Sequence, residues 1–146
     1  MGNGNHIDPI KHVVVLMLEN RSFDQMLGDI PNICGVDPIH RNHSDGKVYA
    51  QKPKARNKIE FDPKHLHPNV MFQIKNSGAN FVQDYWCEYK DRHRRPWDSS
   101  SPNYDDIMDY FSRAKDNRLD ALHTLAETFT VCDQWFSSVP GPTWPN

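Results

Sequence analysis

The feature that most constrains the fold is a short apolar run near the start of the chain. Residues 13–18 read Val-Val-Val-Leu-Met-Leu, and the polar group 19–22, Glu-Asn-Arg-Ser, follows directly. A continuous run rich in β-branched side chains is typical of a strand that is covered on both faces. Residues 11–18 are therefore predicted to form a buried strand. The polar group would lie at the carboxyl end of this strand, where open α/β sheets bind ligands.

Further elements are predicted from capping residues and apolar periodicity. Ser22 and Gly28 predict a short helix over residues 22–28, with Ser22 as its cap. Apolar residues show no regular spacing over residues 30–68, which predicts a long irregular insertion. Such segments are usually functional or mobile. Helices are predicted at 69–85, 105–114 and 120–128, with His123 packed inside, and a β-prone segment is predicted at 129–133.

Charge is distributed unevenly along the chain. Hydrophobic residues make up 37% of the sequence, which indicates long polar loops or a part of a larger domain. Residues 41–95 hold 12 Lys and Arg against 6 Asp and Glu, whereas the remainder holds 5 against 13. A basic middle attracts an anionic substrate or phospholipid headgroups, or it is simply a solvated loop region. No nucleic-acid partner is predicted.

The N-terminus does not resemble a secretion signal, and the cysteines do not indicate disulfide cross-links. The first residues lack a basic region and a long apolar core, and the run 13–18 is too short to span a membrane. Three cysteines without a C-x-x-C pair predict neither a zinc finger nor a disulfide framework. We therefore expect no transmembrane segment and, by default, a cytoplasmic protein, and the oligomeric state stays open.

Two parts of the sequence contain side chains that could act in phosphoryl transfer, either as oxygen ligands of a metal ion or as a nucleophile. Glu19 and Asn20 supply a carboxylate and a carboxamide, which suit Ca²⁺, Mg²⁺ or Mn²⁺, and Zn²⁺ less typically. The alternative is a polar strand end at the surface. The hydroxyl of Thr143 sits on a backbone restrained by neighbouring prolines, and beside a divalent cation it can become a phosphoryl-accepting nucleophile. The alternative is a plain Gly-Pro-Thr turn.

Amide and imidazole side chains are candidates for binding the phosphate itself. Asn146 can donate its amide to a phosphate oxygen, or it is only a polar terminal residue. His65 and His67 lie in the basic part of the sequence, where either can contact phosphate or protonate a leaving group. Each is equally compatible with an ordinary loop position.

Two long blocks resemble the signatures of a known family. Residues 10–24, Ile-Lys-His-Val-Val-Val-Leu-Met-Leu-Glu-Asn-Arg-Ser-Phe-Asp, resemble the opening signature of the bacterial phosphoesterase family. Residues 125–136 and 138–146 resemble its second signature, in the family's order and at about its spacing. Residues 67–85 resemble the intervening segment weakly. The family contains phosphatidylcholine-preferring phospholipases C and certain acid phosphatases.

The resemblance implies a fold and a site. The fold would be α/β, the N-terminal fragment of an alkaline-phosphatase-like three-layer α/β/α sandwich with long irregular insertions. Residues 1–146 would be the N-terminal part of one catalytic domain that is incomplete at its C-terminus. Glu19 and Asn20 would bind a divalent metal cation together with Thr143, which would also be the nucleophile that forms a covalent phospho-enzyme. His67 and Asn146 would contact the phosphate ester or phospholipid headgroup.

The resemblance also places the family's other metal ligands, an acidic pair and further histidines, downstream of residue 146. Three protein ligands fall short of the roughly six oxygens that Ca²⁺ or Mg²⁺ prefers. The 146-residue chain is therefore expected to be inactive alone and to have low stability. The alternatives are an inactive truncated remnant, a fragment that binds anionic ligands through its basic middle, and, among enzymes, a sulfatase-like hydrolase.

Overall fold

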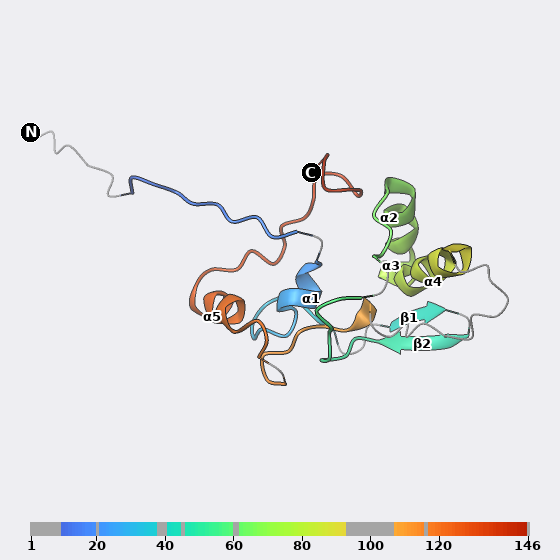
Figure 1. Ribbon diagram of the computed structural model, residues 1–146, viewed down its shortest axis with the longest axis horizontal. Coiled ribbons are helices and arrows are strands. Elements are labelled where there is room, and N and C mark those ends of the chain that lie inside the picture. Colours follow the sequence, from blue (N-terminus) through green and yellow to red (C-terminus); the bar gives the residue numbers. More distant parts are fainter. Residues whose placement is uncertain are drawn as a thin grey trace, which may run out of the picture.

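The computed structural model describes residues 10–19, 21–37, 41–44, 46–59, 62–92, 107–115 and 117–145. These residues form a mixed α/β arrangement. Helices α2, α3 and α4 gather beside a small sheet, whereas α1 and α5 lie toward the other end of the molecule (Figure 1). The elements are α1 Phe23–Leu27, β1 Arg41–Ser44, β2 Lys47–Ala50, α2 His67–Gln73, α3 Lys75–Gly78, α4 Phe81–Arg92 and α5 Asp120–Thr128.

The sheet is an antiparallel hairpin of β1 and β2, inside the region that was predicted to be irregular. Gly46 lies at the turn with a φ of 70°, a left-handed conformation that glycine adopts without strain. Asn42 and Tyr49 pair across the hairpin and are both buried. The Oδ1 atom of Asn42 accepts a hydrogen bond of 3.0 Å from the backbone N–H of Val82, which attaches α4 to the sheet.

The core lies between the hairpin, α4 and the segment that begins at residue 107. Val82, at the start of α4, is fully buried, as expected for the centre of a small apolar cluster. Removing this apolar surface from water is the main favourable contribution to folding. The cluster consists of Tyr49, Val82, Tyr85, Ile107 and Met108, with Ile59 and Phe81 packed against it.

The first long helix predicted from the sequence is divided into α2, α3 and α4. Asn76 and Ser77 have φ values of 53° and 57°, so the chain leaves the right-handed helical conformation there. The carboxylate of Asp84 on α4 accepts hydrogen bonds from Asn69 (3.0 Å) and Gln73 (2.8 Å) on α2. These bonds join the two helices on either side of the break.

Helix α1 confirms the short capped helix predicted from the sequence. The Oγ atom of Ser22 accepts a hydrogen bond of 3.2 Å from the backbone N–H of Gln25, and the helix ends at Gly28. Gly28 and Gly35 approach so closely that a Cβ atom on either would clash with its neighbours. The backbone N–H of Val36 donates to the carbonyl of Gly28 at 2.8 Å, which closes the loop after α1.

Helix α5 confirms the prediction for residues 120–128, and His123 is packed as expected. The side chain of His123 is fully buried, and its Nε2 atom lies 2.8 Å from the carbonyl oxygen of Met26 at the end of α1. At the start of α5, Asp120 forms an ion pair and hydrogen bond with Arg113. Arg113 also contacts Thr124 and Glu127, so polar contacts attach the helix to the body along its length.

The helix predicted over residues 105–114 is wrong for the part that the structure describes. Residues 107 and 108 form one short turn, and Asp109 then forms an isolated bridge with Lys52. The backbone N–H of Tyr110 donates to the carbonyl of Lys52 at 2.8 Å, and Ala55 donates to Tyr110 at 3.1 Å. Pairing with the chain after β2 satisfies these backbone groups and replaces the helical bonds.

The buried strand predicted for residues 11–18 is also wrong. This segment is extended, runs away from the body (Figure 1) and has no strand partner among the described residues. Val14 is 92% exposed. A strand requires a neighbour for its backbone groups and cover for both faces, and the described residues supply neither. The β-prone segment 129–133 likewise belongs to no described sheet. The three-layer sandwich therefore stays a prediction.

Candidate active-site cleft

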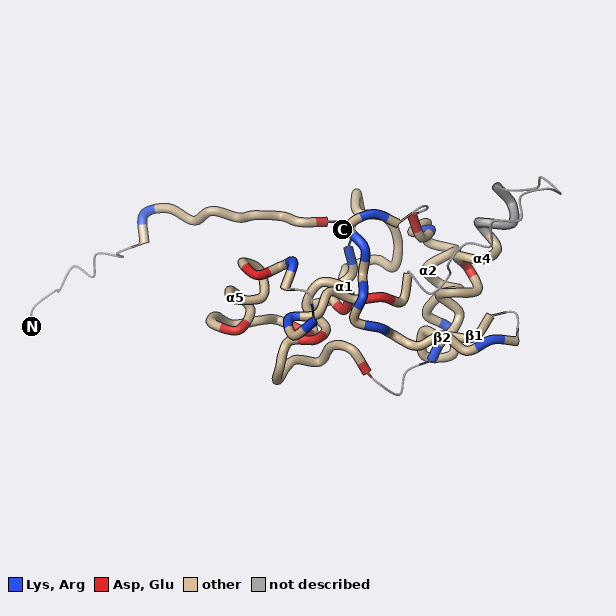
Figure 2. Tube along the Cα trace, turned by 60° about the horizontal axis from the view of Figure 1, so that its bottom comes forward, with Lys and Arg blue, Asp and Glu red and all other residues tan. Residues whose placement is uncertain are grey.

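A cleft of about 880 Å³ lies at the start of α1, and we call it the threonine cleft. Thr143 lines it from the C-terminal loop, and Arg21 and Ser22 line it from the turn before α1. In Figures 1 and 2, the end of the N-terminal apolar segment and the C-terminal loop lie on the same side of α1. The predicted nucleophile thus shares a cleft with the residues that directly follow Glu19 and Asn20.

The charged side chains on the wall of the threonine cleft are mostly basic. Arg21, Lys58, Lys64 and His65 line it, and Asp62 is the one carboxylate among its described lining residues. Figure 2 shows the Lys and Arg positions of the segment between β2 and α2 as a series of blue patches that approaches the C-terminal end. Clustered positive charge raises the local concentration of anions, so the cleft favours a phosphate group.

His67 lies against the loop that carries Thr143. The Nδ1 atom of His67 is 2.7 Å from the carbonyl oxygen of Pro140, which makes a hydrogen bond when this nitrogen carries the proton. A Cβ atom built on Gly141 would be only 3.8 Å from the Cβ atom of His67. His67 does not line the cleft, whereas His65 does. The predicted phosphate contact of His67 stays a prediction, and its observed contact is with the loop.

The predicted metal ligands are described only in part. Glu19 is exposed and does not line the threonine cleft, while Asn20 and Asn146 fall outside the described residues. Within the described ranges, no group of three or more His, Cys, Asp or Glu side chains is arranged to hold a metal ion. By donor chemistry, the oxygens of Glu19, Asn20 and Thr143 fit a hard divalent cation. The metal site therefore stays a prediction.

A hydrogen-bond network joins the turn after Glu19 to the rest of the body. Arg21 donates from Nη1 to the Oε1 atom of Gln25 (3.0 Å) and from Nη2 to the carbonyl oxygen of Asn57 (2.7 Å). Gln25 in turn donates from Nε2 to the carbonyl of Asp109 at 3.3 Å. Sequence reasoning did not identify Arg21 or Gln25 as site residues. The available signal was the position of Arg21 inside the polar group 19–22.

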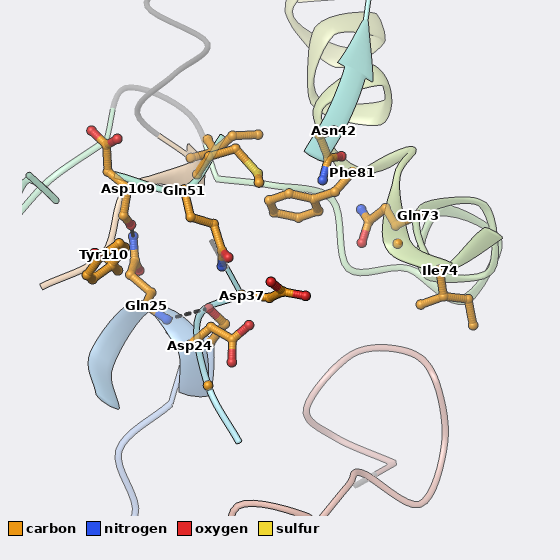
Figure 3. A pocket seen from close by; sticks show the side chains of 15 residues that line it. Asp24, Gln25, Asp37, Asn42, Gln51, Gln73, Ile74, Phe81, Asp109 and Tyr110 are labelled. Carbon is orange, nitrogen blue, oxygen red and sulfur yellow. Dashed lines mark hydrogen bonds between the residues drawn. The ribbon is translucent and has the colours of Figure 1, made fainter. Parts of the chain in front are cut away.

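A second pocket, of about 410 Å³, adjoins the threonine cleft. The two share five lining residues, which are Ser22, Gln25, Gln73, Phe81 and Ile107. Asp24, Asp37 and Asp109 line this acidic pocket, and its described lining contains no Lys, Arg or His. In Figure 3, Asp24 and Asp37 lie at the pocket, whereas the carboxylate of Asp109 points away from it. The two neighbouring pockets therefore differ in the sign of their charge.

Tyr110 lies on the wall of the acidic pocket. Burial, and then the charge of Asp29, raise the pKa of the Tyr110 phenol above its ordinary value of 10.0. The phenol consequently stays protonated near neutral pH.

The chain is similar to phospholipases C over nearly its whole length. Hemolytic phospholipase C of Pseudomonas aeruginosa is 32% identical over 96% of this chain and 18% of its own length. Non-specific phospholipase C6 of Arabidopsis thaliana is 33% identical over 94% of this chain and 26% of its own length. Phospholipase C B of Mycobacterium tuberculosis is 30% identical over 97% of this chain and 29% of its own length. No solved structure matches the chain.

The chain therefore spans less than a third of each of these relatives. The helices in the described residues include none that is long and apolar enough to cross a membrane.

The model of the phosphoesterase family matches residues 10–146. This range contains the two signature-like blocks at residues 10–24 and 125–146. The chain belongs to the phosphoesterase family.

Proposed function

We propose that the chain takes part in the hydrolysis of phosphate esters, as in a phospholipase C or an acid phosphatase, with Thr143 as the nucleophile. The observation that supports this most is that one basic cleft is lined both by Thr143 and by Arg21 and Ser22. The named activities of the similar proteins also support it. The substrate would be a phospholipid headgroup ester or a small phosphate monoester.

In the proposed reaction, the Oγ1 atom of Thr143 attacks the phosphorus, and the bond to the leaving alcohol breaks. This gives a covalent phospho-threonine, which water hydrolyses in a second step. The hydrogen bond between His67 and Pro140 holds the loop so that the hydroxyl stays at the cleft. Restraint of this kind matters because a misplacement of about 1 Å can cost two orders of magnitude in rate.

A divalent cation would be held by Glu19, Asn20 and Thr143, with Ca²⁺, Mg²⁺, Mn²⁺ and Zn²⁺ all open. Such a cation would lower the pKa of the Thr143 hydroxyl and would stabilise the negative charge on the phosphoryl group. Lys58, Lys64 and His65 contribute positive or hydrogen-bonding groups on the cleft wall. Asn146 would donate its amide to a phosphate oxygen, and His65, which lines the cleft, would protonate the leaving group.

The test compares Thr143→Ala with Thr143→Ser. Turnover is measured on the chain itself and on a hybrid enzyme. The hybrid is the hemolytic phospholipase C with its matching segment replaced by residues 10–146 of this chain, because the chain spans only 18% of that relative. The substrates are p-nitrophenyl phosphate and its phosphorylcholine ester. We expect the hybrid to hydrolyse at least one ester, Thr143→Ala to abolish turnover, and Thr143→Ser to retain part of it. Near-normal turnover by Thr143→Ala would exclude Thr143 as the nucleophile.

A further inference from the structure

We propose that Arg21 binds the phosphate group in the threonine cleft directly and that Gln25 is the positioning residue that orients the Arg21 guanidinium. This inference rests on the proposed function, because it names the group that recognises the anion of that same site. It adds a charged contact from a residue that the sequence analysis assigned no role. The supporting observations are the charge of Arg21, its hydrogen bonds and its place on the cleft wall.

Among the residues that the structure describes, no carboxylate neutralises the positive charge of Arg21. Its side chain is half-buried, its hydrogen bonds go to the neutral oxygens of Gln25 and Asn57, and no described carboxylate lies within ion-pair distance. Arg113 differs, because Asp120 and Glu127 both pair with its guanidinium. A guanidinium stays protonated at all ordinary pH values, so Arg21 offers a permanent charge to an incoming anion.

The hydrogen bonds also fix how the guanidinium is presented. Nη1 is held by Gln25 and Nη2 by Asn57, which restrains the plane of the group. A guanidinium carries five N–H donors, so these two bonds leave donors that can bind phosphate oxygens. Arg21 and Thr143 line the same cleft, and in the proposed complex a phosphate bound there contacts both residues. Planar, pre-oriented guanidinium groups suit bidentate phosphate binding.

Gln25 is itself held in one orientation. Its Nε2 atom donates to the carbonyl of Asp109, so its Oε1 atom is the end that faces Arg21. The backbone carbonyl of Gln25 accepts a hydrogen bond of 2.8 Å from the N–H of Phe111. The orientation of the guanidinium therefore depends on a residue that is attached to the core segment at two points, once through its carboxamide and once through its backbone carbonyl.

The experiment measures binding of inorganic phosphate to the full chain by isothermal titration, with the thermal midpoint of each variant recorded in parallel. The variants are Arg21→Met, Arg21→Lys and Gln25→Met. Lys47→Met is the matched control, because Lys47 is an exposed cation on β2 that does not line the cleft. We expect Arg21→Met to weaken phosphate binding roughly 10- to 100-fold, as loss of a hydrogen bond to a charged group does.

Arg21→Lys retains the charge but not the planar donors, so it should recover only part of the affinity. Gln25→Met should weaken binding less than Arg21→Met, with a thermal midpoint near that of the unsubstituted chain, and Lys47→Met should bind normally. If Arg21→Met does not fold, Arg21→Lys and Gln25→Met together carry the test.

Unchanged phosphate affinity in folded Arg21→Met, or in both Arg21→Lys and Gln25→Met, overturns the inference. The inference is also overturned if the unsubstituted chain binds no phosphate, or if the control variant loses as much affinity as Arg21→Met.

Failure of the proposed function gives a different pattern of results. In that case the hybrid shows no turnover and no phospho-threonine, while phosphate binding to the chain still depends on Arg21.

Discussion

At the scale of single residues, two histidines attach separate segments to the body through carbonyl oxygens. His123 is fully buried and contacts the carbonyl of Met26, whereas His67 is exposed and contacts the carbonyl of Pro140. The buried contact contributes mainly to stability, because both its apolar surface and its hydrogen bond are removed from water. The exposed contact restrains the loop that carries Thr143, the proposed nucleophile.

Substitution of His123 tests the buried contact. His123→Ala should lower the free energy of unfolding by about 2–4 kcal/mol, because it leaves a cavity and a buried carbonyl without its donor. The measurement is urea denaturation, with His43→Ala as the control because His43 is exposed on β1. The control should change the free energy by less than about 0.5 kcal/mol. Equal effects of the two variants would contradict this account of His123.

The ion pair at the start of α5 predicts a pH dependence. The hydrogen bond and the charge of Arg113 lower the pKa of Asp120 below its ordinary value of 3.8. The pair's contribution to stability is therefore fully present above about pH 4 and is lost as the pH falls through the lower pKa of the folded state. Asp120→Asn should lower the thermal midpoint slightly at pH 7 and have no effect in strong acid. An effect that grows on acidification would contradict the assignment.

At the scale of elements, α1 and α5 were predictable because their signals are local. Ser22 caps α1, Gly28 ends it, and apolar spacing marks residues 120–128. The segment from residue 107 was not predictable, because its backbone pairs with residues 52–55, which are distant in the sequence. Local periodicity carries no information about such a partner, and tertiary pairing therefore replaced the helix that apolar spacing favoured.

The connection between α2 and α4 depends on one buried carboxylate. Asp84→Ala should lower the free energy of unfolding by about 3 kcal/mol, because the amides of Asn69 and Gln73 would lose their acceptor in a buried setting. Gln83→Ala, on an exposed position of the same helix, is the control and should be nearly neutral. Urea denaturation measures both variants, and a neutral Asp84→Ala would show that the carboxylate does not join the helices.

At the scale of the whole molecule, the main departure from expectation is the exposed apolar segment at residues 13–18. Its composition favours a buried strand, but burial also requires neighbouring strands, and the described residues provide a single hairpin elsewhere. The site prediction came from the two signature-like blocks. Thr143 lines the threonine cleft, and its role and those of Glu19 and Asn20 stay predictions. The contact between Arg21 and Gln25 could not be predicted, because it depends on side-chain packing.

The exposed segment gives a test that separates the observed structure from the buried-strand prediction. Val14→Lys should leave the thermal midpoint unchanged and reduce concentration-dependent association, because Val14 is 92% exposed and contributes to an apolar surface. Val82→Lys, at a fully buried position, should unfold the chain. Light scattering and thermal melting measure both effects. A large loss of stability in Val14→Lys would show that the segment is buried.

The central claim is that the hydroxyl of Thr143 receives the phosphoryl group. The most direct measurement incubates the hybrid enzyme with p-nitrophenyl phosphate and a divalent cation, stops the reaction with acid, and locates the phosphoryl group by tandem mass spectrometry. The account predicts phosphorylation at Thr143 that is absent from Thr143→Ala. Steady turnover with the phosphoryl group on another residue, or unaffected by Thr143→Ala, would contradict it.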